Sequence, residues 1–346
     1  MAKFKLDKIN DLKVSLQNNL WYKYFKNVIE IETWIDFEME IENILKQISI
    51  LLKSETTQSK KVNYFRDISI NYSDFNLFGI IEHKLDDKEV FSVTEKYLDK
   101  RKREIKSKDI LSDLSNSFEE FISIFNRYLV DILGVFYENK THNHIIPFHL
   151  INQIFTFNYT PTLENFYGVD KSKVVYLHGE MHANNEIQNL VFGISEIPDD
   201  VKIIKAYDFA KYYQRIKKNS NRKFIEIPID KKSGLEETIF YIIGHSLDES
   251  DKEYISALFK FLEFDLSGNS RICVFYHSSH DREHKLKNLF SIIDKNDVVE
   301  MEKVGRLYFV ELDIENTNRE FSRKIVISGD SHFFYKKTAP ISESRL

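Results

Sequence analysis

Residues 154–180 read IFTFNYTPTLENFYGVDKSKVVYLHGE, and this stretch decides the fold of the second half of the chain. Two short apolar runs, IFTF and VVYL, each give way at once to polar residues. Asn158 and Thr160 follow the first run, and His178 and Gly179 follow the second. Short apolar runs without alternation are typical of strands that are buried on both faces of a parallel sheet. The stretch therefore predicts two buried strands that each end on groups able to bind a ligand.

Four further runs of the same kind extend the pattern. They are NLVFG (189–193), IFYII (239–243), RICVFY (271–276) and RLYFVEL (306–312). Several are flanked by helical patterns, which predicts an α/β fold with a Rossmann-like, largely parallel sheet. Ligands bind beyond the carboxyl ends of the strands in such sheets. We therefore expect Asn158, His178 and the residues after IFYII to lie on one rim.

The third group of rim residues lies in the stretch FYIIGHSLDESDKEYISALF. Gly244 permits a tight turn after the strand, and Ser246 or Asp248 is suited to cap the helix that follows. Exposed amides at the start of this helix favour an anion such as a nucleotide phosphate, and Ser246 is able to donate to a ribose hydroxyl. The alternative is an ordinary strand-to-helix turn with a good cap.

The amino-terminal part has a helical period. In WIDFEMEIENILKQISILL the apolar residues recur at spacings of three and four, and SKDILSDLSNSFEEFISIFNRYLVDILG repeats the pattern. Ser107 or Asp109 is the expected N-cap of the second helix, and Gly134 marks its end. The first helix also carries clustered carboxylates, for which we expect a solvated face because they point to different sides. They are Asp36, Glu38, Glu40 and Glu42.

Composition narrows the class of protein. The 346 residues are 42% hydrophobic and 14% aromatic, which is ample for a buried core. Lysine and arginine number 49 against 54 acidic residues, so no overall basic excess favours nucleic acid or an anionic membrane. The only cysteine, Cys273, lies in an apolar run and gives neither a disulfide framework nor a thiolate metal site. Without an apolar stretch of about 18 residues, the protein is expected in the cytoplasm.

Three weaker patterns offer alternatives. His277, His280 and His284 in YHSSHDREHKLKN invite a metal reading, but we expect a polar loop that opens a helix and no metal. The basic stretches at 96–106 and 211–223 are the best candidates for nucleic-acid binding, although solvated surfaces are the favoured interpretation. A serine esterase is not expected, because its nucleophile motif needs a second glycine where this chain has an aspartate.

Several of these stretches together resemble one protein family. FNYTPTLENFYG, VVYLHGEMH with NLVFGISE behind it, FYIIGHSLDESDKEYI and ICVFYHSSHDREHKLKNL resemble the AbiH family of bacteriophage abortive-infection proteins. WIDFEMEI resembles the Trp-containing acidic helix of that family, so the resemblance covers most of residues 20–312. AbiH proteins in turn look like distant relatives of the sirtuin-like fold, a Rossmann-type NAD-binding domain.

The resemblance implies anti-phage defence through a site for NAD, as substrate or ligand. In the sirtuin-like group, an Asn and the His of a His-Gly pair serve the NAD-cleaving site, and these match Asn158 and His178. A Gly-x-Ser turn holds the adenosine ribose there, and it matches Gly244 and Ser246. The expected catalytic residues are thus Asn158 and His178, and the expected nucleotide-binding residues are Thr160, Gly179, Gly244, His245, Ser246 and Asp248.

The start of the sequence departs from the family pattern. AbiH proteins typically open with a strand and a Gly-Asn-Gly-Phe-Asp loop, whereas MAKFKLDKINDLKVSLQNNLW resembles the region downstream of it. No Gly-x-Gly phosphate cradle occurs among the ten glycines. A start placed too late and a lineage that has shed the loop both remain open. The departure argues against full NAD glycohydrolase activity and keeps an alternative: an inactive scaffold or sensor that binds a phage component, a partner protein or RNA.

These patterns predict a single AbiH-like domain over residues 1–346. Its mainly helical part is expected at 9–140, and its Rossmann-like part at 148–330. The expected partners are a nucleotide and a phage-derived trigger, with oligomer formation left open and no membrane partner.

Overall fold

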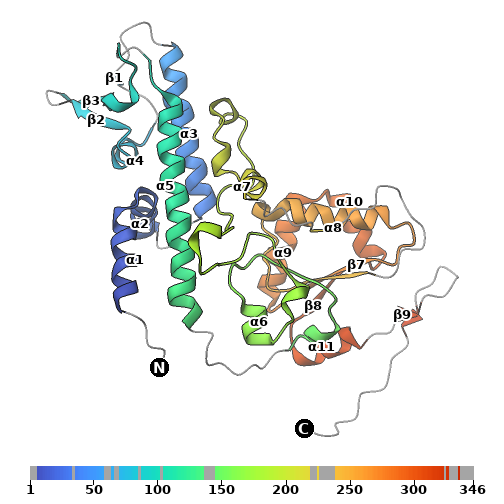
Figure 1. Ribbon diagram of the computed structural model, residues 1–346. Coiled ribbons are helices and arrows are strands. Elements are labelled where there is room, and N and C mark those ends of the chain that lie inside the picture. Colours follow the sequence, from blue (N-terminus) through green and yellow to red (C-terminus); the bar gives the residue numbers. More distant parts are fainter. Residues whose placement is uncertain are drawn as a thin grey trace. The chain divides into compact units, whose positions relative to one another are not determined.

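The protein is described by a computed structural model, shown in Figure 1. The described residues are 6–32, 36–57, 64–65, 70–84, 87–101, 104–135, 145–218, 224–225, 238–322, 325–326 and 334–335. The chain forms two compact units, which are considered separately. The first comprises Met1–Thr141 and Phe155–Arg222, and the second His142–Ile154 and Lys223–Leu346. Among the described helices, none has the length and apolar character needed to span a bilayer.

The first unit is mainly helical (Figure 1). Its helices are α1 (Leu6–Asn18), α2 (Leu20–Glu32), α3 (Phe37–Thr57), α4 (Tyr72–Leu77), α5 (Ser107–Tyr128), α6 (Thr162–Tyr167) and α7 (Lys211–Lys217). An antiparallel sheet has the order β1-β3-β2, built from β1 (Tyr64–Phe65), β2 (Ile81–Lys84) and β3 (Asp87–Val93). The strands β4 (Ile154–Thr156) and β5 (Val174–Tyr176) pair with each other.

The core of the first unit surrounds Trp21, whose side chain is fully buried. The Trp21 indole nitrogen donates to the carbonyl oxygen of Leu114 at 3.0 Å, which joins α2 to α5. Aromatic rings from α2 itself and from other parts of the chain contact the indole, and they belong to Tyr24, Phe25, Phe78, Phe118 and Phe209. The predicted apolar stripe of α3 is confirmed by full burial of Ile41, Ile44, Leu45 and Ile48.

The acidic residues around the start of α3 do not form the solvated face that the sequence suggested. Asp36 caps the helix, because its carboxylate accepts a hydrogen bond from the backbone N–H of Glu38 at 3.0 Å. Glu40 is buried and accepts a hydrogen bond from the Tyr24 hydroxyl. Glu38 forms an ion pair with the buried Lys211. For Glu38 and Glu40 the expectation was wrong because each has a partner outside α3, which the pattern of the helix itself does not reveal.

Helix α5 confirms the second predicted helix but not its cap. The helix begins at Ser107, and Lys106 occupies the N-cap position without a side-chain hydrogen bond to the helix. The expected caps Ser107 and Asp109 are thus both inside the helix. Its apolar stripe is buried as predicted, and the chain continues through a π-helical turn, Leu129–Leu133, that ends at Gly134.

The second unit contains a parallel sheet of the order β6-β7-β8. Its strands are β6 (Ile239–Ile242), β7 (Arg271–Tyr276) and β8 (Leu307–Glu311), and its helices are α8 (Lys252–Phe264), α9 (Ser279–Ile292), α10 (Lys295–Lys303) and α11 (Ile314–Phe321). The short strands β9 (Ile325–Val326) and β10 (Phe334–Tyr335) pair antiparallel. Ile272 and Val274 of β7 pack in one core with residues of α8, α9 and α10. Phe275 faces the other way and stacks on Phe321 of α11, so helices cover both faces of the sheet.

The mixed α/β fold with short parallel strands is confirmed, but one predicted strand is wrong. Residues 189–193 are not a strand, although the run is apolar. The Phe192 N–H donates to the Gln214 side chain at 3.1 Å, and the Phe192 carbonyl accepts from the same amide at 2.7 Å. A glutamine side chain thus satisfies backbone groups that a neighbouring strand would otherwise satisfy. The Rossmann-like and sirtuin-like identity of the fold stays a prediction.

A buried carboxylate fixes the turn between α8 and β7. Asp265 has a fully buried side chain, which accepts hydrogen bonds from the backbone N–H groups of Ser267 at 3.0 Å and Ser270 at 2.7 Å. The Arg306 guanidinium lies 3.4 Å from the same carboxylate. Burial alone would raise the pKa of Asp265, but the hydrogen bonds from Ser267 and Ser270 outweigh it and hold the pKa below its ordinary value.

Replacing this carboxylate tests its contribution to stability. We expect Asp265→Asn to lower the free energy of unfolding by roughly 3 kcal/mol at pH 7, because it leaves buried donors poorly paired. A lowered pKa stabilises the folded state above the ordinary pKa of about 3.9, and this stabilisation is lost as the pH falls through the folded-state pKa. In urea unfolding, the difference in unfolding free energy between the unaltered chain and Asp265→Asn should therefore be smaller at pH 3 than at pH 7. The exposed Glu263→Gln is the matched control, and equal unfolding of both variants would contradict the assignment.

Candidate functional site

The segments after β4 and β5 lie against each other. The Leu177 N–H donates to the Thr156 carbonyl at 2.9 Å, and the Met181 N–H donates to the Tyr159 carbonyl at 2.8 Å. These two hydrogen bonds bracket His178 on one segment and Asn158 on the other. The structure thus brings together the first two groups that the sequence placed at strand ends.

His178 is enclosed by aromatic rings and is 6% exposed. Its ring lies 5.2 Å from that of Phe157, edge to face, and 6.4 Å from that of Tyr159. The carbonyl oxygen of His178 accepts from the Val191 N–H at 2.8 Å, and the Tyr159 hydroxyl donates to the Val191 carbonyl at 3.0 Å. These contacts hold the backbone and the ring of His178 in one orientation.

Gly179 is required by a close approach of two backbone segments. Its φ is +86°, and a Cβ atom at this position would lie 2.2 Å from the carbonyl oxygen of Asn189. The Asn189 side chain accepts from the Glu180 N–H at 3.0 Å, which fixes the same approach. The glycine after the histidine therefore has a structural role, whether or not its amide also contacts a ligand.

Asn158 and Thr160 are the accessible members of this group. The Asn158 N–H donates to the hydroxyl of Thr156 at 3.1 Å, while its side chain is exposed. Within the part of the chain that the structure describes, the Asn158 carboxamide has no hydrogen-bond partner and is free to bind a ligand. The Thr160 hydroxyl lies 2.9 Å from that of Thr162 and keeps further hydrogen-bonding capacity.

The turn after β6 contains two residues in the left-handed region. Gly244 has a φ of +66°, as the sequence suggested, and Leu247 has a φ of +59° although it carries a side chain. Leu247 is buried at 1% exposed, so packing holds this strained conformation. Asp248 caps a short helical turn by accepting from the Ser250 N–H at 3.0 Å, which confirms one of the two predicted caps. Ser246 is exposed.

His245 is engaged inside this turn. Its Nδ1 accepts from the Leu247 N–H at 2.9 Å, and its Nε2 lies 3.2 Å from the carboxylate of Asp251. Because Nδ1 must accept, the neutral tautomer carries its proton on Nε2, which donates to Asp251. The imidazole therefore braces the turn, and the exposed Ser246 next to it remains available to a ligand.

The predicted site residues fall into two groups on different units. Asn158, Thr160, His178 and Gly179 belong to the first unit, and Gly244, His245, Ser246 and Asp248 belong to the second. The structure assembles each group by itself. A single site that comprises both groups is a proposal.

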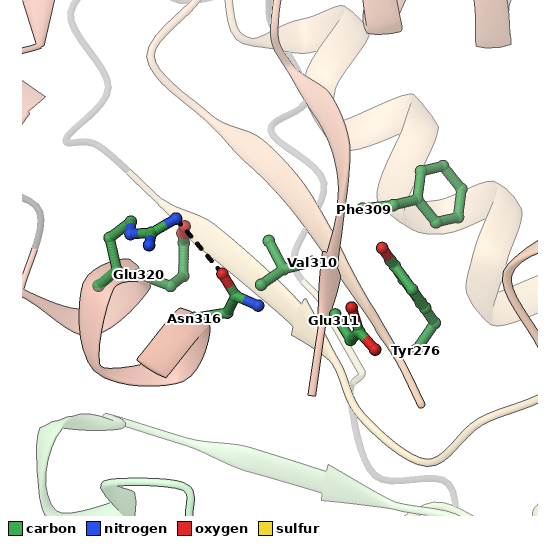
Figure 2. Close-up of a pocket in the computed structure, with 7 residues that line it drawn as sticks. Tyr276, Phe309, Val310, Glu311, Asn316 and Glu320 are labelled. Carbon is green, nitrogen blue, oxygen red and sulfur yellow. Dashed lines mark hydrogen bonds between the residues drawn. The ribbon is translucent and has the colours of Figure 1, made fainter. Parts of the chain in front are cut away.

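Sequence reasoning missed a cavity in the second unit, shown in Figure 2. It has a volume of about 250 Å³ and lies where β7 and β8 end beside α11. Tyr276 and Glu311 are the last residues of these strands and are partners in the sheet register. Both strands were predicted, so the strand-end argument that singled out Asn158 applies equally to Tyr276 and Glu311.

The histidine cluster after β7 is organised around a carboxylate. Asp281 accepts two hydrogen bonds from the buried Lys285, at 2.5 and 2.6 Å, and lies 2.8 Å from Nδ1 of His277. Burial would raise the pKa of Asp281, but Lys285 and the His277 N–H outweigh it and lower the pKa. His280 and His284 are exposed on α9. Among the described residues, no group of three or more potential ligands is placed to hold a metal ion.

The basic stretch around α7 is largely paired within the protein. Lys217 lies 2.9 Å from the carboxylate of Asp208, and Lys218 lies 3.1 Å from that of Glu119. Burial lowers the pKa of Lys218, although the carboxylate opposes this effect. Arg222 and Lys223 lie outside the described residues. The two described lysines are thus engaged with neighbouring carboxylates.

Two glycine substitutions test the backbone approach at Gly179. Gly168 is the matched control, because it also has a positive φ, +62°, but has open space around its Cβ position. We expect Gly168→Ala to cost about 1 kcal/mol, from the conformation alone. Gly179→Ala should cost roughly 3 kcal/mol or prevent folding, because it also clashes with the Asn189 backbone. Thermal denaturation of both variants is the measurement, and equal losses would contradict the close approach.

Comparison with known proteins identifies the family of the chain. The model of the family described as bacteriophage abortive infection AbiH matches residues 7–276, a span that includes both groups of strand-end residues. No curated protein was found to match the chain. No solved structure was found to match it either. Because the family model covers more than half of its length, the chain belongs to the AbiH family of bacteriophage abortive-infection proteins.

Proposed function

We propose that this AbiH protein defends cells against phage by binding NAD and hydrolysing its bond between nicotinamide and ribose. The observation that carries the proposal is the pairing of the segments after β4 and β5, which places the uncommitted Asn158 carboxamide beside the His178 segment. The AbiH family supports the part in phage defence. The choice of NAD rests on the resemblance of these strand-end residues to sirtuin-like sites.

In the proposed reaction the protein positions the substrate and water and accepts a proton, and it forms no covalent bond to the substrate. The bond between ribose C1′ and the nicotinamide nitrogen breaks, water adds to C1′, and nicotinamide, ADP-ribose and a proton are the products. Asn158 would hold the water or a ribose hydroxyl with its carboxamide, and His178 would accept the hydroxyl proton. Ser246 would donate to a hydroxyl of the adenosine ribose, and the amides of the turn before α8 would bind phosphate oxygens.

The burial of His178 sets a condition on this mechanism. A ring that is 6% exposed and contacts Phe157 and Tyr159 reaches a substrate only after local opening of the segment around it. The same enclosure favours a second candidate function, a catalytically inactive scaffold that senses a phage component or binds a partner. In that case His178 is a structural histidine, and the strand-end residues present a surface.

Two measurements separate the candidates. If NAD is hydrolysed, infected cells that carry the chain should lose NAD, and His178→Ala should reduce the rate about a hundredfold or more. Asn158→Ala should reduce it at least tenfold, because the water or ribose is no longer positioned. Nicotinamide release and phage plaque counts are the readouts, with the exposed His280→Ala as the matched control.

The outcomes point in different directions. NAD loss that depends on His178 supports hydrolysis. Defence that persists in a folded His178→Ala variant, with NAD unchanged, rejects hydrolysis and favours the scaffold.

A further inference from the structure

The cavity at the ends of β7 and β8 has polar groups that the fold leaves available. Tyr276 and Glu311 project to the same face of the sheet because they are register partners on neighbouring parallel strands. Figure 2 shows these two side chains with Phe309 on one side of β8, and Asn316 and Glu320 on the other. The Leu312 N–H donates to the Tyr276 carbonyl at 2.7 Å, which fixes the two strand ends against each other.

The groups on the α11 side of the cavity are already engaged. The Asn316 carboxamide donates to the Asp313 carboxylate at 2.5 Å, and its oxygen accepts from Arg319 at 3.4 Å. Arg319 also forms an ion pair with Glu315 at 2.6 Å. Glu320 is buried and accepts a hydrogen bond from the hydroxyl of Tyr308 on β8.

The polar groups at the ends of β7 and β8, Tyr276 and Glu311, are not engaged in this way. Within the described part of the chain, neither the Glu311 carboxylate nor the Tyr276 hydroxyl has a hydrogen-bond partner. Glu311 offers two acceptor oxygens, and Tyr276 offers a hydroxyl that both donates and accepts. A ligand in the cavity therefore meets a strong acceptor and a hydroxyl on adjacent strands, beside an aromatic ring.

The charge around the cavity selects among ligands. The carboxylates of Glu311 and Glu320 line the cavity together with the guanidinium of Arg319, which also pairs with Glu315 outside the lining. Carboxylates therefore outnumber guanidinium groups here, and the cavity disfavours a simple anion. It favours a neutral group whose hydroxyls donate to a carboxylate while its ring packs against an aromatic side chain.

We propose that Glu311 and Tyr276 bind the vicinal hydroxyls of a ribose ring in a nucleoside or nucleotide. The Glu311 carboxylate accepts from both hydroxyls, and the Tyr276 hydroxyl bonds to one of them. The choice of ribose among sugars rests on the proposed nucleotide function, while the diol chemistry rests on the cavity. This site is separate from the turn at Ser246, and a dinucleotide such as NAD carries two ribose rings.

Calorimetric titration of the full chain with adenosine tests the assignment. We expect adenosine to bind, 2′,3′-dideoxyadenosine to bind at least tenfold more weakly, and AMP to bind about as well as adenosine. Glu311→Ala should weaken adenosine binding at least tenfold, and Tyr276→Phe several-fold. Glu300→Gln, an exposed residue of α10, is the matched control and should bind as the unaltered chain does. Circular dichroism of each variant verifies that it is folded.

Several results would overturn the proposal. They are an unaltered chain that does not bind adenosine, equal binding of adenosine and its dideoxy analogue, binding of AMP alone, or a folded Glu311→Ala variant with unchanged affinity. Nicotinamide release is measured in parallel, so that a failure of the ribose site can be told apart from a failure of NAD hydrolysis. Diol binding through Glu311 without nicotinamide release retains the ribose site and rejects hydrolysis. NAD hydrolysis with an unchanged KM in Glu311→Ala supports the hydrolysis and rejects the ribose site at Glu311.

Discussion

The contact between the backbones at Gly179 and Asn189 is the constraint on which the candidate site in the first unit depends. It returns the chain to β5 immediately after His178, with no room for a side chain at position 179. The return brings Val191 to the His178 carbonyl and to the Tyr159 hydroxyl. The approach thereby helps to hold the His178 ring against Phe157 and Tyr159. A single glycine thus couples the backbone path to the orientation of the imidazole.

In the second unit, the parallel sheet determines where apolar and polar side chains lie. Because side chains alternate along a strand, Val274 packs under α8 to α10 while Phe275 packs against α11. Apolar residues fill most of both faces, and the polar groups that remain open to a ligand lie where the strands end. Tyr276, Glu311 and the turn at Gly244 all lie at such ends. The proposed ligand contacts in both units follow from this distribution.

The sequence predicted those features that depend on local period. The stripes of α3 and α5, five of the six short strands and the tight turn at Gly244 could all be predicted from spacing and residue type. Partners far apart along the chain could not. Gln214 takes the place of a neighbouring strand for residues 189–193, and Lys211 pairs with Glu38, so an apolar run was mistaken for a strand and a paired carboxylate for a solvated one. The cavity required the position of α11 against β8, which no local pattern specifies.

The division of the chain into units has a consequence for its synthesis. The first unit comprises Met1–Thr141 and Phe155–Arg222, and the intervening His142–Ile154 belongs to the second. As the polypeptide leaves the ribosome, this segment of 13 residues emerges well before Lys223–Leu346, the remainder of its own unit. Translation of the first unit is thus complete before most of the second unit has been made. No single cut of the chain separates the units, because three boundaries divide them, so a proteolytic or genetic dissection must make three cuts.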